Sequence, residues 1–255
     1  MNELLFLGTG AADWDVKAEN GFYRRNSSVL LNKNLIIDCG KEVFDFAESI
    51  NQPNLYSEVT DILISHNHGD HLDRESIFRI ADNRKIRLGC NKKIIDKIGL
   101  HPNIEYIVFE PHKEVVFGEY TVIPLMANHF VTNDIDNLAY HPIVRTPDGK
   151  EIFYGLDGAW FLYSTWEEMK KHKFDVMLFD CTVGDSEDWR LFEHNTIPML
   201  RMMLNEIKNK QLLNSEGKYI ATHLARTLHK SHEDTEKILK EMDMITAFDG
   251  MKIEF

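Results

Sequence analysis

A run of metal-ligand side chains directly after an apolar segment is the feature that most constrains how this chain can fold. Residues 61–65 are predicted as a buried strand, and His66-Asn67-His68-Gly69-Asp70-His71 follows them. Side chains two residues apart on an extended backbone point the same way, so His66 and His68 can bind one cation together. Gly69 is expected to let the backbone turn, so that Asp70 and His71 face a second cation. The chain therefore needs a rigid sheet whose strand ends present this cluster.

The donor types in this cluster indicate which metals it would take. Imidazole nitrogens suit zinc, manganese or iron, and the carboxylate adds a hard oxygen ligand and negative charge. The alternative interpretation is a solvated histidine-rich turn, which would require three His and one Asp to fall at these spacings by chance. We therefore predict two divalent transition-metal ions, zinc or manganese, with iron also compatible.

Composition and length favour one folded domain. The chain has 255 residues, of which 43% are hydrophobic and 27% charged, as in globular proteins. No repeat or Gly/Ser-rich linker divides it, so residues 1–255 are predicted to form one domain.

No segment is apolar over the roughly 18 residues that a membrane span needs, so no membrane partner and a cytoplasmic location are expected. Cys39, Cys90 and Cys181 are widely spaced and are expected to be buried thiols without a disulfide.

The net charge limits the partners. A formal charge of −12 disfavours binding to nucleic acid in the absence of a separate basic patch. A small anionic substrate is still compatible, because two cations would dominate the local field. A homodimer is also compatible with the sequence.

Short apolar runs alternate with turn signals along the whole chain and predict two packed sheets flanked by helices. Strands are predicted from β-branched and aromatic content at Leu4–Leu7, Ser28–Leu31, Leu35–Ile37, Asp61–Ser65, Ile86–Gly89, Glu105–Phe109, Tyr120–Met126, Ala139–Val144, Glu151–Gly155, Val176–Phe179 and Tyr219–Ala221. Helices are predicted from apolar residues three or four apart at Lys41–Ile50, Asp73–Ile80, Ile94–Ile98, Thr165–Lys171, Thr196–Lys208 and Glu233–Met242.

The motif resembles the metallo-β-lactamase superfamily, in which His-x-His-x-Asp-His follows a strand. The resemblance implies an α/β fold, an αββα sandwich of two mixed sheets. It also implies three further ligands at strand ends, for which His129, Asp157 and His223 are the candidates. By resemblance, one metal would be held by His66, His68 and His129, the other by Asp70, His71 and His223, and Asp157 would bind both. Taken singly, His129 could be a surface loop residue and Asp157 a turn residue.

The resemblance extends toward the N-terminus. Leu5-Phe6-Leu7-Gly8-Thr9-Gly10 is similar to the family's opening strand and turn, Arg25-Asn26-Ser27-Ser28 to the start of its second strand, and Leu35-Ile36-Ile37-Asp38-Cys39-Gly40 to its strand ending in Asp-x-Gly. We expect Asp38 to accept a hydrogen bond from a metal-binding His rather than to bind metal itself.

The expected chemistry is hydrolysis. Two cations about 3.5–4 Å apart lower the pKa of a bridging water, orient the hydroxide for attack and stabilise the charge that develops. Asp70 could in addition accept a hydrogen bond from the nucleophile. The diiron flavoprotein relatives carry Glu at the position of His68, so this residue favours a hydrolase.

One further motif points to phosphodiesters. Phe192-Glu193-His194-Asn195-Thr196-Ile197-Pro198 resembles the subgroup that includes the phosphoribosyl cyclic phosphodiesterase of carbon–phosphorus lyase pathways. The resemblance implies that His194 is the general acid that protonates the leaving alkoxide, with His232 as the alternative acid. The other interpretation is that His194 merely precedes a helix capped by Asn195. The long stretch 205–218 between His194 and His223 departs from the subgroup, and no four-cysteine zinc site is present in the sequence.

Several nearby polar residues receive lesser roles. Asp180 is interpreted either as structural or as a residue that contacts a ligand from behind. His229 and His232 are interpreted as solvated residues near a helix start, the alternative being that they approach the site through the loop. Arg25 and Arg226 are candidate phosphate contacts.

Three other functions compete with a phosphodiesterase. A tRNA 3′-end endonuclease would need a basic arm, which the sequence lacks. A thioester or lactone hydrolase would need less help from an acid. A non-catalytic metal-binding accessory protein would retain the metals without turnover.

Overall fold

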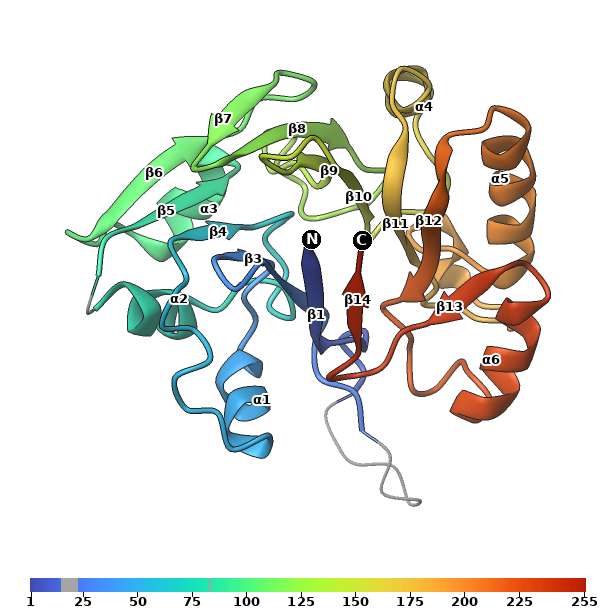
Figure 1. The fold of residues 1–255 in the computed structure, drawn as a ribbon, viewed down its shortest axis with the longest axis horizontal. Helices are drawn as coiled ribbons and strands as arrows, with labels where there is room; N and C mark the ends of the chain where they lie inside the picture. The colour runs from blue at the N-terminus through green and yellow to red at the C-terminus, as the bar shows by residue number, and fades with distance from the viewer. Residues whose placement is uncertain (15–22, 83) are drawn as a thin grey trace.

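The computed structural model describes residues 1–14, 23–82 and 84–255, and these form two seven-stranded mixed sheets that face each other (Figure 1). The first sheet has the order β14-β1-β2-β3-β4-β5-β6, with bounds Lys252–Glu254, Glu3–Gly8, Ser28–Leu31, Leu35–Ile37, Asp61–Leu63, Ile86–Cys90 and Ile104–Val108. The second has the order β13-β12-β11-β10-β9-β8-β7, with bounds Met244–Thr246, Leu213–Thr222, Phe174–Asp180, Glu151–Gly155, Tyr140–Arg145, Tyr120–Met126 and Val115–Phe117.

Helices cover the outer face of each sheet. The first sheet packs against α1 (Val43–Ser49), α2 (Arg74–Ala81) and α3 (Lys92–Ile98), and the second against α4 (Tyr163–Met169), α5 (Ile197–Asn209) and α6 (His232–Lys240). A short 3-10 helix, η1 (Trp189–Phe192), precedes α5. The layers are thus helices, sheet, sheet and helices, which confirms the predicted αββα sandwich. None of the helices in the described ranges is long and apolar enough to span a membrane.

The core has three apolar layers because the inner strands are buried on both faces. In β11, Val176 and Leu178 face the first sheet, whereas Met177 and Phe179 face α5. This period of two turns one continuous apolar run into two packing surfaces. Apolar residues of both sheets share the central layer. This shared layer is consistent with the prediction of one domain over residues 1–255.

The secondary structure follows the sequence prediction except at the sheet edges. Each predicted strand and helix is present, with shifts of a few residues at the ends; β12 is longer than predicted and begins at Leu213. Three strands were not predicted, β7, β13 and β14, and each has three residues and lies at the edge of a sheet. Such short strands depend on pairing with a neighbour, which a local sequence pattern does not report.

The strand directions bring polar loops to one edge of the molecule. Strands β10, β11 and β12 are parallel, and β8 runs the same way because β9 is antiparallel to both β8 and β10. In the first sheet β3 and β4 are also parallel. Within two residues of the ends of β3, β10 and β12 one residue has a left-handed backbone, with φ of 60° at Asp38, 54° at Asp157 and 56° at His223. The chain turns sharply there and presents polar side chains between the sheets.

A pair of one half-buried histidine and one buried glutamate on the second sheet gives a test of stability against pH. Nδ1 of His172, after α4, lies 3.0 Å from Oε2 of Glu151 at the start of β10. Hydrogen bonding to Glu151 raises the pKa of His172, although burial opposes the shift. The stability from this pair is therefore fully present below the unfolded pKa of about 6.5 and is lost as pH rises through the higher folded pKa.

We predict that His172→Gln lowers the free energy of unfolding by about 1–2 kcal/mol at pH 6 and by less at pH 9. Urea denaturation at the two pH values measures this, with the neighbouring exposed Lys171→Gln as control. A loss for His172→Gln that is the same at both pH values would contradict a charged pair.

Candidate metal centre

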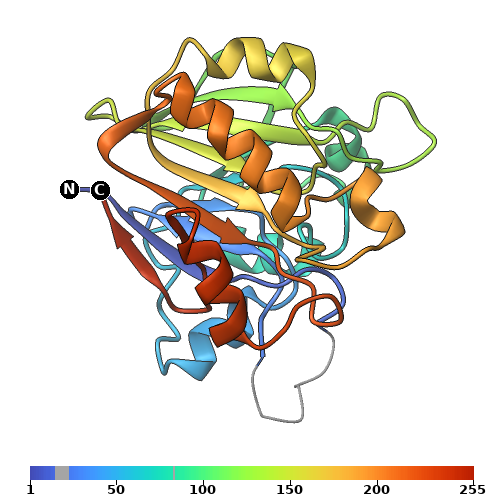
Figure 2. The same ribbon diagram turned by 90° about the vertical axis from the view of Figure 1, so that its right-hand side faces the viewer.

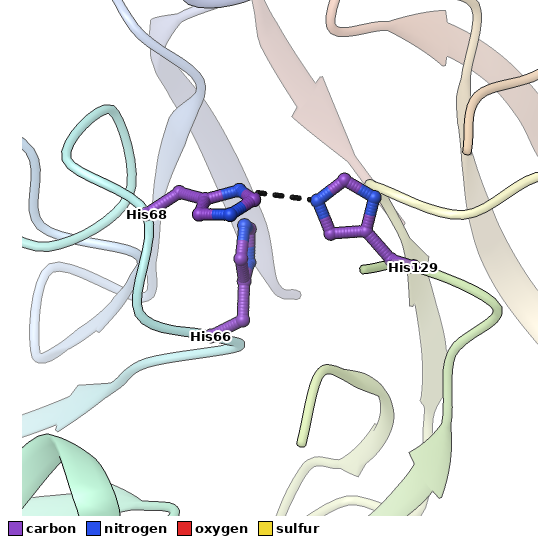
Figure 3. A group of neighbouring side chains, drawn as sticks. All are labelled: His66, His68 and His129. Atoms are coloured by element: carbon purple, nitrogen blue, oxygen red, sulfur yellow. Dashed lines mark hydrogen bonds between the residues drawn. The ribbon is translucent and has the colours of Figure 1, made fainter. Parts of the chain in front are cut away.

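Seven candidate metal ligands meet at the ends of β4, β8, β10 and β12, between the two sheets. The first group is His66, His68 and His129, whose ligand nitrogens lie within 4.8 Å of one another. Nε2 of His129 lies 3.1 Å from Nδ1 of His68, and Figure 3 shows the three rings converging from two loops. His66 is fully buried. Three imidazoles in this arrangement can hold one cation.

The second group is Asp70, His71 and His223. Nε2 of His71 lies 3.3 Å from Oδ2 of Asp70 and 3.3 Å from Nε2 of His223. Nε2 of His223 lies 3.6 Å from the same Asp70 oxygen. One carboxylate and two imidazoles therefore point at a common position that a second cation can occupy.

Asp157 lies between the two groups. Its Oδ2 is 2.5 Å from Nε2 of His71, 3.3 Å from Nε2 of His223 and 3.8 Å from Nε2 of His66. Its Oδ1 is 4.0 Å from Nε2 of His129. One carboxylate thus reaches imidazoles of both groups, as a bridging ligand must.

Two buried polar atoms show that the donors fit cations. Nε2 of His66 and Oδ2 of Asp157 are buried without a hydrogen-bond partner among the described residues. A buried polar atom left in that state costs about 1–3 kcal/mol. Oδ2 of Asp157 lies close to three imidazoles but makes no hydrogen bond with them. Side chains that bind the same metal ion are arranged in this way, because each directs a lone pair at the ion and not at its neighbour.

The electrostatics agree with a pair of divalent ions. Burial alone would raise the pKa of Asp157, but His223 and His71 hold it well below its usual range. Burial lowers the pKa of His66, which favours the neutral imidazole that binds metal. Carboxylate oxygens of Asp70 and Asp157 lie beside the imidazoles, and a mixed oxygen and nitrogen donor set of this kind suits divalent cations.

Asp38 orients His71 from the first sheet, in the place the sequence predicts. Its Oδ2 accepts from Nδ1 of His71 at 2.7 Å and from the Tyr154 hydroxyl at 3.0 Å. The backbone N–H and hydroxyl of Ser65 donate to the same carboxylate at 2.8 and 2.9 Å. A carboxylate held in this way fixes the proton on Nδ1 and leaves Nε2 of His71 free for a metal.

Asp180, for which the sequence left open a structural role or an orienting contact behind a ligand, takes the second of these places. Its Oδ2 lies 2.8 Å from Nδ1 of His194 and 3.4 Å from Nδ1 of His223, and its Oδ1 accepts from the backbone N–H of Asn195 at 2.9 Å. The hydroxyl of Thr182 lies 2.7 Å from Nδ1 of His223. Burial opposes ionisation, but His194 keeps the pKa of Asp180 below its usual value. Its position at a strand end, like those of Asp38 and Asp157, is the signal that could have identified it.

His194 lies beside the metal ligands. Its ring stacks on that of His223, with centroids 5.5 Å apart and planes at 15°. Nδ1 lies 3.3 Å from Oδ1 of Asp157 in addition to its contact with Asp180. Burial would lower the pKa of His194, but the two carboxylates raise it, which favours the protonated ring.

Other sequence candidates lie elsewhere or are already paired. Arg25 bonds Asp45 at 2.6 Å and lies 3.4 Å from Asp249, and Nε of Arg226 donates to the backbone oxygen of Asp13. Nδ1 of His232 lies 2.9 Å from Nη2 of Arg24.

Two of the sequence interpretations are wrong. His229 is not a solvated side chain, because it is half-buried and its Nε2 lies 2.6 Å from the Cys181 oxygen. The cap of α5 is Thr196 rather than Asn195, because the Asn195 side chain accepts from the Trp160 N–H instead.

The two glycines next to the ligands differ in what they contribute. Gly69 does not have a left-handed backbone, and a Cβ there would meet nothing within 4 Å, so the turn after His68 does not require glycine. A Cβ on Gly40 would lie 2.4 Å from the backbone oxygen of Asp70. The close approach that shapes the motif is therefore made by Gly40, on the strand-end loop that also carries Asp38.

We predict that Gly40→Ala displaces the backbone of Asp70 and weakens binding of the second metal at least tenfold. Gly69→Ala is the matched control and should bind both metals as the wild type does. Zinc titration followed by calorimetry measures both stoichiometry and affinity. Unchanged affinity in Gly40→Ala would contradict this role for the glycine.

Metal binding should also stabilise the fold, because it supplies partners to the buried ligand atoms. At a zinc or manganese concentration of 100 Kd, the chelator-treated protein should gain about 2.7 kcal/mol, a rise in melting temperature of roughly 5–10 °C. Asp157→Asn should lose most of this gain and at least one metal, whereas the exposed Asp185→Asn should keep both. Two metals per chain in Asp157→Asn would contradict a shared carboxylate.

Comparisons with known proteins agree with this geometry. Residues 33–238 match the family model described as the beta-lactamase superfamily domain. No curated protein sequence matches the chain.

The structural neighbours share the fold at low sequence identity. The metallo-beta-lactamase fold protein YhfI from Bacillus subtilis superposes with a TM-score of 0.75 and 17% identity, over 99% of this chain and 98% of the other. A diphosphatase from the PhnP family gives a TM-score of 0.74 and 17% identity, over 100% and 98% of the two chains. Zinc-bound PqqB from Methylobacterium extorquens superposes with a TM-score of 0.73 and 12% identity, over 99% of this chain and 100% of the other. Because the family model covers most of the sequence, the chain belongs to the metallo-β-lactamase superfamily.

Proposed function

We propose that this protein is a binuclear metal-dependent phosphodiesterase that hydrolyses a small or cyclic phosphodiester, with His194 as general acid. The observation that carries the proposal is the position of His194, whose Nδ1 is held by Asp180 at 2.8 Å beside the shared ligand Asp157. The PhnP-family diphosphatase among the structural neighbours is in keeping with phosphoester chemistry.

The proposal places two metals among the candidate ligands. His66, His68 and His129 would hold one ion, Asp70, His71 and His223 the other, and Asp157 would contact both. When bound, two divalent ions supply a water of lowered pKa and Lewis-acid stabilisation of charge on the phosphoryl oxygens. Zinc and manganese suit these donors, and iron is also compatible. Zinc-bound PqqB is a neighbour of the same fold.

The protein's own residues handle the protons. The Asp70 carboxylate can accept a hydrogen bond from the attacking water and orient it. The contacts of Nδ1 with Asp180 and Asp157 leave Nε2 of His194 as the nitrogen that gives its proton to the departing alkoxide. The bond from phosphorus to that oxygen breaks as the proton arrives, so the leaving group departs as a neutral alcohol. Asp180 keeps the ring oriented and stabilises its protonated form.

Each alternative function predicts a different result. A thioester or lactone hydrolase has a leaving group that needs little protonation, so His194 would matter less there. A tRNA 3′-end endonuclease would favour RNA over small diesters, and a non-catalytic metal-binding protein would turn over neither. Cytoplasmic location, a small-molecule partner and a homodimer stay predictions.

We predict that His194→Asn lowers kcat on a dialkyl or cyclic alkyl phosphodiester by about 10²–10⁴-fold, because the alkoxide then leaves without its proton. The loss on bis(p-nitrophenyl) phosphate should be much smaller, since p-nitrophenolate is a stable anion. Steady-state kinetics with measured metal content tests this.

His232→Asn is the matched control, because His232 is the alternative acid, and it should retain turnover on both substrates. Equal losses on the two substrates in His194→Asn, or a loss on the alkyl diester confined to His232→Asn, would contradict the assignment of His194.

A further inference from the structure

Exposed aromatic side chains gather on the three loops that carry His129, Asp157 and His194. Phe130 is 55% exposed, Trp160 41%, Trp189 68% and Phe192 75%. We call these four side chains the aromatic rim. Phe130 follows His129, Trp160 lies three residues after Asp157, and Phe192 lies two residues before His194. In Figure 2 the loop after β8 and the turn that contains η1 project on the same side of the molecule.

Hydrogen bonds tie the three loops into one structure. The Asn128 side chain donates to the Ala159 oxygen at 2.6 Å, and the Ala159 N–H donates to the Asn128 oxygen at 3.2 Å. The Trp160 N–H donates to Oδ1 of Asn195 at 3.0 Å. Nδ1 of His129 lies 3.3 Å from the Glu193 oxygen. These bonds tie the three loops to one another beside the candidate ligands, and the Trp160 side chain also lines a pocket with Trp166 and Met202.

The backbone at two rim positions is held in place. Trp160 has φ of 49°, a left-handed conformation that a bulky side chain rarely adopts. Its hydrogen bond to Asn195, the residue after His194, fixes this conformation and directs the chain away from Asp157. Phe192 ends η1, and the Arg190 oxygen in that turn accepts from the N–H of His194 at 2.7 Å. Rim and general acid thus share their backbone supports.

A cluster of this kind requires a binding explanation. Single exposed apolar residues are ordinary on protein surfaces, whereas clusters of them mark recognition sites. Aromatic rings present flat faces at a low conformational-entropy cost, and they stack with planar aromatic groups of any heterocycle. Cations held by these residues would attract the anionic phosphate, but they give no preference for an aromatic substituent.

We infer that the aromatic rim stacks with a planar aromatic or heteroaromatic group on the substrate while the phosphodiester lies at the metal centre. The inference rests on the proposed function and adds to it a substrate class, a phosphodiester that carries a ring such as a nucleobase. The reaction is unchanged, and the rim acts only in binding.

The test uses a matched pair of substrates on the metal-loaded protein. A nucleoside 2′,3′-cyclic phosphate and ribose 2′,3′-cyclic phosphate present the same reacting group with and without a base. The wild type should favour the nucleotide in kcat/KM by about tenfold or more, mainly through KM. Phe130→Ala and Phe192→Ala should each raise KM for the nucleotide several-fold and leave the base-free substrate unaffected. Phe248→Ala removes an exposed aromatic ring from the turn between β13 and β14 and should change neither.

A binding measurement separates this inference from the proposed function. Because Trp160 and Trp189 belong to the rim, a nucleoside monophosphate should quench tryptophan fluorescence, and ribose 5-phosphate should not. Quenching that weakens in Phe130→Ala and Phe192→Ala supports the rim even if no phosphodiester is turned over, in which case only the proposed function fails. Equal KM values for the two cyclic substrates with no selective quenching would overturn the inference. Rim variants that change the sedimentation coefficient but not nucleotide binding would also overturn it, by showing a surface between protein chains.

Discussion

The charge of one buried carboxylate, Asp157, sets the requirements that the surrounding structure meets. A carboxylate without compensation in an apolar interior is highly unfavourable, and the nearby imidazoles are themselves buried. The strand ends of both sheets must therefore converge on it. His66 and His71 follow β4 and reach Asp157 across the gap between the sheets, whereas His129 follows β8 and His223 follows β12 in the sheet that carries Asp157. Such a centre joins the two sheets as well as binding cations.

The outer carboxylates repeat one arrangement on both sides of this centre. Asp38 contacts Nδ1 of His71 from the first sheet, and Asp180 contacts Nδ1 of His223 from the second. Each leaves Nε2 of its histidine directed at Asp157. Asp180 differs in that it also holds His194, so the residue that orients a ligand from the second sheet orients the proposed acid as well. We expect metal position and proton transfer to be coupled through this carboxylate.

How much of this could be predicted depends on whether the signal is local in sequence. His66, His68, Asp70 and His71 stand within one short run, and the apolar period of two predicts the strand before them. His129, Asp157 and His223 are single residues, and only their order relative to a family pattern identified them. The sequence could not decide whether Asp180 is structural or orients a ligand, because one Asp at a strand end has many ordinary uses. The edge strands β7, β13 and β14 were missed because their neighbours, rather than their own residues, define them.

The aromatic rim could not be predicted for a related reason: no periodicity distinguishes an exposed Phe or Trp in a loop from a buried one. Phe130, Trp160 and Phe192 lie far apart in the sequence, and only the hydrogen bonds among their loops show that these loops are neighbours. The strand ends hold the candidate metal ligands in position, whereas the loops between the strands can vary without disturbing either sheet. The loops are therefore where members of this superfamily can differ in substrate while they keep the same ligands.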